Sequence, residues 1–76
     1  MKAPILEIQH DPEPTHVLYG VGAEYVAPSD GALTLRAVDN DVSIRWAQLR
    51  GATSLRMQGG ETCPITVVKG DVIEIV

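Results

Sequence analysis

The chain lacks the covalent and metal-based means by which many small domains are stabilised. Cys63 is its one cysteine in 76 residues, so no disulfide can form within a single molecule. One cysteine and two histidines do not provide a structural zinc site either. A chain of this length buries only about 60% of the surface that its unfolded form exposes. By elimination, we expect oligomerisation to supply the missing stability.

Basic charge and long apolar runs are scarce as well. The net charge is −4, from ten acids against six bases, which argues against a nucleic-acid-binding surface. No apolar run approaches the ~20 residues that span a bilayer, and no apolar stretch of the signal-peptide kind follows Met1. We therefore expect neither nucleic acid nor a membrane as a partner. We also expect the chain to fold in a cytoplasm, and a lone thiol agrees with this.

Helical periodicity is missing, whereas period-two alternation of apolar and polar residues is regular from residue 24 onwards. Turn residues at 28–31, 39–40, 59–60 and 69–71 separate the alternating segments, and Asp39-Asn40 suits a tight hairpin. The pattern predicts an all-β fold, a small antiparallel β-sandwich or jelly-roll-like barrel. Strands are expected at 24–27, 33–38, 42–47, 54–58, 65–67 and 72–76.

The alternation also predicts which side chains face the core. Phenylalanine is absent, so Trp46 is the largest core candidate, and its indole N–H needs a hydrogen-bond partner if it is buried. The predicted inward set is Leu33, Leu35, Val42, Ile44, Trp46, Leu55, Met57, Ile65, Val67, Ile73 and Ile75.

The first 23 residues differ in composition from the rest. They hold three of the five prolines and both histidines, and proline removes a backbone donor and restrains its neighbour. We expect residues 1–23 to form an extended arm with one or two short strands, and residues 24–76 to form the sandwich. Pro12 and Pro14 are candidate contacts of such an arm with a neighbouring subunit.

Several valines fall on the phase opposite to the predicted core. One interpretation is that they are isolated surface apolar residues, which are normal. The other is that they line a subunit or partner interface. The residues concerned are Val38, Val68, Val72 and Val76.

Arginines recur on the outward phase of the predicted strands. Arg36, Arg45 and Arg56 are candidate contacts for phosphate, sulfate or an acidic glycan. The alternative is cross-strand pairing with Asp39, Asp41 or Glu74, which contributes a few tenths of a kcal/mol per pair.

Catalytic and metal-binding signals are weak. His10, Asp11, Glu13 and His16 include ligand types for a metal, but two prolines separate them and favour a solvated linker. Cys63 has no activating base nearby in the sequence and is interpreted as a small buried residue. We expect no enzyme activity, no metal and no cofactor.

Two phrases resemble those of a known group of proteins. YVAPSDG at 25–31 and VVKGDVI at 67–73 resemble turns that frame small β-domains of bacteriophage virion proteins, namely head decoration (cement) proteins and trimeric tail-fibre or spike tips. The resemblance covers roughly residues 24–76. The second phrase also resembles biotinyl and lipoyl carrier domains, but the modified lysine between two methionines is missing, since Met57 lies between Arg56 and Gln58.

The virion resemblance implies a non-enzymatic structural protein that decorates or stabilises the virion. It implies a homotrimer or another symmetric homo-oligomer, assembled in the host cytoplasm and bound to a larger capsid or fibre protein. The alternative is a carbohydrate- or receptor-binding β-module of the tail-fibre-tip type, which would bind through Tyr19, Tyr25 and the arginines.

Overall fold

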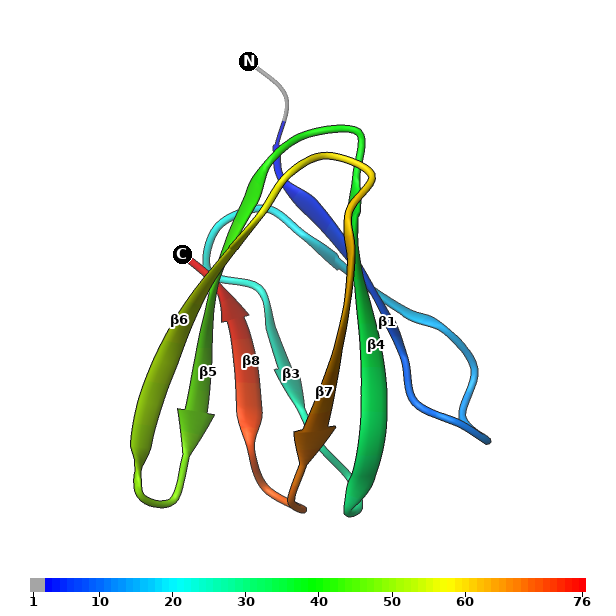
Figure 1. The fold of residues 1–76 in the computed structure, drawn as a ribbon, viewed down its shortest axis with the longest axis vertical. Coiled ribbons are helices and arrows are strands. Elements are labelled where there is room, and N and C mark those ends of the chain that lie inside the picture. The colour runs from blue at the N-terminus through cyan, green and yellow to red at the C-terminus, as the bar shows by residue number, and fades with distance from the viewer. Residues whose placement is uncertain (1–2) are drawn as a thin grey trace.

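The computed structural model describes residues 3–76 and consists of two four-stranded antiparallel sheets packed face to face (Figure 1). The first sheet has the order β2-β1-β4-β7 and the second the order β3-β8-β5-β6. The predicted small all-β sandwich is thus confirmed. Within residues 3–76 there is no helix that could cross a membrane. The strands are β1 Ile5–Gln9, β2 His16–Tyr19, β3 Glu24–Val26, β4 Gly31–Val38, β5 Val42–Gln48, β6 Gly51–Met57, β7 Thr62–Val67 and β8 Val72–Ile75.

Most connections carry the chain from one sheet to the other, as in a jelly roll. Only β1 and β2, and β5 and β6, are consecutive strands that pair with each other. The hairpin predicted at Asp39-Asn40 is therefore wrong, because β4 and β5 lie in different sheets. Asp39 does adopt the left-handed conformation, with φ of 62°. The residue types at 39–40 thus predicted that the chain bends here, but not that β5 would join the other sheet instead of pairing with β4.

The N-terminal segment is part of the sandwich and not an arm outside it. The two strands expected in residues 1–23 are present as β1 and β2, and β1 lies between β2 and β4. Leu6, Ile8 and Leu18 are buried in the core. The proline-containing stretch 10–15 is only the loop between these two strands. Met1 and Lys2 lie outside the described residues.

All the residues predicted to face inward belong to the core or pack against it. Three of them, Trp46, Leu55 and Ile65, are only partly buried. Each fully buried Leu, Ile or Val contributes about 1.5–3 kcal/mol relative to an exposed one. The predicted inward set did not include the further buried residues Leu6, Ile8, Leu18, Ala27 and Ala37.

Turns interlock at both ends of the sandwich. At one end the Lys69 amide donates to Asp30 Oδ1 at 2.7 Å, and the Gly70 amide donates to the Ala27 carbonyl at 2.9 Å. The YVAPSDG and VVKGDVI phrases are therefore joined in space by hydrogen bonds. At the other end the Gly59 amide donates to Asp41 Oδ1 at 3.1 Å. These bonds fix the connections that pass between the sheets.

Candidate functional site

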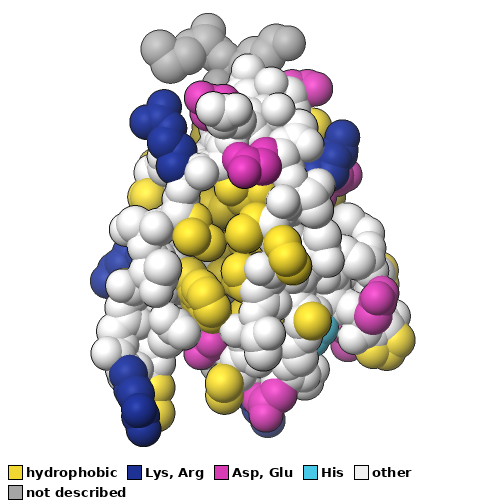
Figure 2. Space-filling view, viewed as in Figure 1, with side chains coloured by type: hydrophobic (Ala, Val, Ile, Leu, Met, Phe, Trp, Pro, Cys, Tyr) yellow, Lys and Arg dark blue, Asp and Glu magenta, His cyan; other side chains and the backbone are white. Residues whose placement is uncertain are grey.

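The sandwich is open along the side where β6 and β7 run. In the described sheets β6 pairs with β5 alone and β7 with β4 alone, so each strand has a free edge. Trp46, Leu55, Cys63 and Ile65 face the core but remain partly exposed between these edges. Figure 2 looks into this side and shows apolar side chains gathered in the middle of the molecule. We call these four residues and the two free edges the open seam.

A second apolar surface lies on the outer face of the second sheet. Cross-strand register places Val26, Val72, Ala47 and Ala52 in one row across β3, β8, β5 and β6. They occupy the phase opposite to the buried Ile44, Ile73 and Ile75, and Val26 is 57% exposed. The row therefore crosses all four strands with no polar side chain in it.

The neighbouring row on this face carries charge of both signs. Glu24 on β3 lies directly opposite Glu74 on β8, and Glu74 lies opposite Arg45 on β5. Like charges directly opposite one another on adjacent strands are destabilising. Within residues 3–76 the ion pairs are Arg36–Glu7 and Arg56–Asp41. Glu24, Glu74 and Arg45 take part in neither of them.

A hollow of about 590 Å³ lies where this face meets the β5–β6 and β7–β8 turns. Ala47 and Val72 belong to its lining, and Leu49 and Val68 at its rim are fully exposed and 61% exposed. Asp71 holds one wall in place by accepting hydrogen bonds from Trp46 Nε1 and the Val68 amide. The hollow thus extends the apolar row to the end of the sheet.

The structure brings only some of the predicted interface valines together. Val68 and Val72 line the same hollow, and Val76 continues β8 on the same side and is 50% exposed. Val38 lies on β4 in the other sheet, on its outer face beside Ile5. Pro12 and Pro14 are exposed in the β1–β2 loop, away from this row.

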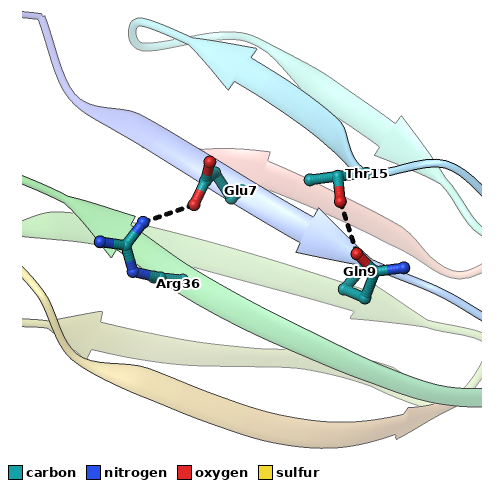
Figure 3. Close-up of polar contacts among 4 residues, drawn as sticks. All are labelled: Glu7, Gln9, Thr15 and Arg36. Carbon is teal, nitrogen blue, oxygen red and sulfur yellow. Dashed lines mark hydrogen bonds and ion pairs between the residues drawn. The ribbon is translucent and has the colours of Figure 1, made fainter.

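The predicted arginine stripe is divided between the two sheets. Arg36 lies on the first sheet and pairs with Glu7 at 2.6 Å (Figure 3). Arg45 and Arg56 lie on the second sheet, where Arg56 approaches Asp41 at 3.8 Å. Arg36 and Arg56 thus each have an acidic neighbour. Asp41 is one of the partners that the cross-strand pairing alternative names, whereas Glu7 is not.

A shallow polar hollow of about 230 Å³ lies on the outer face of the first sheet. Glu7, Arg36 and Gln9 line it together with Thr15, Thr34 and Thr62. Gln9 accepts a hydrogen bond from Thr15 Oγ1 and donates one to the Glu13 carbonyl at 3.2 Å, so it ties the β1–β2 loop to the sheet (Figure 3).

The two histidines flank Tyr25. His10 is buried, and its Nδ1 lies 3.3 Å from the Tyr25 hydroxyl. The His16 ring lies against Tyr25, with ring centroids 5.1 Å apart. Burial, with a smaller contribution from the nearby Glu13 carboxylate, raises the pKa of Tyr25. Among residues 3–76 no group of three or more His, Cys, Asp or Glu side chains is placed to hold a metal ion.

Sequence reasoning missed the alanines of the apolar row, Ala47 and Ala52, and the acidic pair Glu24 and Glu74. Alternation marks Ala47 and Glu74 as outward residues, whereas Ala52 lies outside the predicted strand 54–58 and Glu24 lies in a predicted strand with no inward residue assigned. Only the cross-strand register shows that the four share a face. Comparison with known protein families, with curated proteins and with solved structures gave no match to this chain. The function is therefore inferred from these surfaces and from the two turn phrases.

Proposed function

We propose that this protein is a non-enzymatic structural protein of a bacteriophage virion, which it decorates as a symmetric homo-oligomer bound to a larger capsid or fibre protein. The observation that carries the proposal is the open seam. Trp46, Leu55 and Ile65 have the phase of core residues, yet they stay partly exposed between two unpaired strand edges. A partner that covers them would complete the core.

The edges suit a partner that adds a strand. An extended segment that pairs with a free edge gains main-chain hydrogen bonds, and its alternate side chains enter the pockets beside it. Binding of this kind stabilises a small domain by mass action. Many copies on one particle also gain from multivalency, so that each contact can be weak. The virion setting itself rests on the resemblance of residues 25–31 and 67–73.

The test has two steps. Light scattering of the purified protein should give a mass of at least two 8.2 kDa chains, since the resemblance implies a homotrimer or another symmetric assembly. The labelled protein should then co-sediment with phage particles purified from the source culture. A chain that stays monomeric at millimolar concentration and pellets with no particle would contradict the proposal.

The alternative is a carbohydrate-binding module, which the polar hollow on the first sheet favours. Glu7, Arg36 and Gln9 offer charged and amide groups to sugar hydroxyls there. A glycan array separates the two functions, because a monomer that retains a sugar supports the alternative. Thr34 is an exposed residue of the hollow's lining. Thr34→Trp should fill the hollow and abolish sugar retention without changing the number of chains in the assembly.

A further inference from the structure

The apolar row on the outer face of the second sheet is complementary to itself in shape. In the row of apolar residues, the larger side chains Val26 and Val72 stand on β3 and β8, and the smaller Ala47 and Ala52 stand on β5 and β6. Along this row, the half on β3 and β8 is therefore raised by valines and the half on β5 and β6 is lowered by alanines. A second copy that is turned around would place valine over alanine along the whole row.

The charges on this face are divided in the same way. Both acids, Glu24 and Glu74, stand on β3 and β8, and Arg45 stands on β5 in the same row. The two acids lie directly opposite each other, which costs stability in the isolated chain. Arg45 of the same chain adjoins Glu74, and a second arginine brought in by a partner would relieve this repulsion further.

We propose that two copies of the chain pack these faces together about a two-fold axis that runs along the strands, between β8 and β5. In this arrangement Val72 covers the partner's Ala47, and Glu74 meets the partner's Arg45. Val26 covers the partner's Ala52. Each contact occurs twice, because a two-fold interface uses the same surface on both subunits.

A stable interface buries about 800 Å² on each partner, which is about one sixth of the 4773 Å² that the chain exposes. The face spans four strands, and sheets commonly pack face to face with their strands within about 30° of one another. The inference rests on the proposed function, in which the protein acts as a homo-oligomer, and it names a two-fold contact of that oligomer, which calls for an even number of chains.

Charge reversal tests the arrangement. Arg45→Glu alone and Glu74→Arg alone each set like charges against each other twice per dimer, and each should weaken the dimer about tenfold or more. Mixing these two variants should restore association, because each supplies the charge that the other needs. Ala52→Glu gives a second probe at an exposed position and should also weaken the dimer. Arg36→Glu, the same charge change on the other sheet, is the matched control.

The readout is sedimentation equilibrium from micromolar to millimolar protein, with circular dichroism to establish that each variant is folded. Loss of association in both single variants and its recovery in their mixture would support the contact. An oligomer that none of the three substitutions weakens, or one that the mixture does not restore, would overturn this contact and leave the proposed oligomer standing. A wild-type chain that is monomeric throughout would overturn both.

Discussion

The indole Nε1 of Trp46 donates a hydrogen bond to Oδ2 of Asp71 at 3.2 Å. The same oxygen accepts a second hydrogen bond, at 3.1 Å, from the Val68 amide. Asp71 is only 7% exposed, so water cannot readily replace it as the acceptor. One carboxylate therefore joins the middle of β5 to the β7–β8 turn and gives the tryptophan the partner that its position requires.

Removal of this carboxylate should destabilise the fold. We expect Asp71→Ala to lower the free energy of unfolding by about 1–3 kcal/mol, because two donors lose their acceptor in a partly buried place. Urea denaturation followed by the fluorescence of Trp46, the one tryptophan in the chain, measures this directly. Asp71→Asn keeps an oxygen acceptor and should lose less. Equal stability of both variants and the wild type would show that the bonds contribute nothing.

The sequence was sufficient to identify most of the core from residue 24 onwards, but not the sheets. Alternation marks inward positions, since it depends only on the period of the strand, and Leu33, Ile44 and Ile73 are fully buried as predicted. Sheet membership depends on which strand edges meet after each turn, and the residues of a turn do not encode this. Asp39 bends the chain as expected, but the strand that follows joins the other sheet.

The same limit applies to the candidate surfaces. Val38 and Val72 both carry the outward phase, yet they lie on opposite sheets. The prolines of the first 23 residues suggested an arm, because proline is unfavourable inside a sheet. In the fold Pro12 and Pro14 occupy only a loop, and the apolar residues on either side of that loop form β1 and β2.

The interlocked turns predict an asymmetry between two neighbouring glycines. A Cβ at Gly59 would lie 2.3 Å from the Asp39 carbonyl oxygen, whereas one at Gly60 would have no atom within 4 Å. Gly59→Ala should therefore cost about 2–3 kcal/mol through overpacking of a backbone contact. Gly60 has φ of +86°, so Gly60→Ala should cost only the 1–2 kcal/mol or so of a left-handed alanine. Thermal unfolding compares them, and a larger loss in the Gly60 variant would contradict the interlock.

The open seam predicts binding of a hydrophobic dye by the free protein. Exposed apolar side chains between β6 and β7 should bind 1-anilinonaphthalene-8-sulfonate, and Leu55→Glu should reduce the fluorescence at least about twofold, because it places a charge among them. Leu55 is partly exposed, so the variant should remain folded. Ser54→Glu is the matched control, since it adds the same charge one residue away on the opposite face. Equal dye binding by the two variants would show that the seam is not the binding surface.

The environment of Tyr25 predicts a loss of stability in alkali. Burial and Glu13 raise the pKa of this phenol above its usual value of 10.0. The unfolded chain therefore releases the phenolic proton at a lower pH than the folded chain does. The contribution of this proton to the free energy of unfolding is therefore fully present below pH 10. It is lost as the pH rises from there through the higher pKa of the folded state. Thermal unfolding between pH 8 and pH 11 should show the decline.

Tyr25→Phe is the comparison that isolates this effect. It removes the ionisable group together with the contact to His10 Nδ1, so its stability should be lower near pH 8 and should decline less above pH 10. Tyr19→Phe, at a tyrosine that is 70% exposed, should retain the alkaline decline of the wild type. Parallel pH profiles for the wild type and the Tyr25 variant would show that this phenol is not held in its neutral form by the fold.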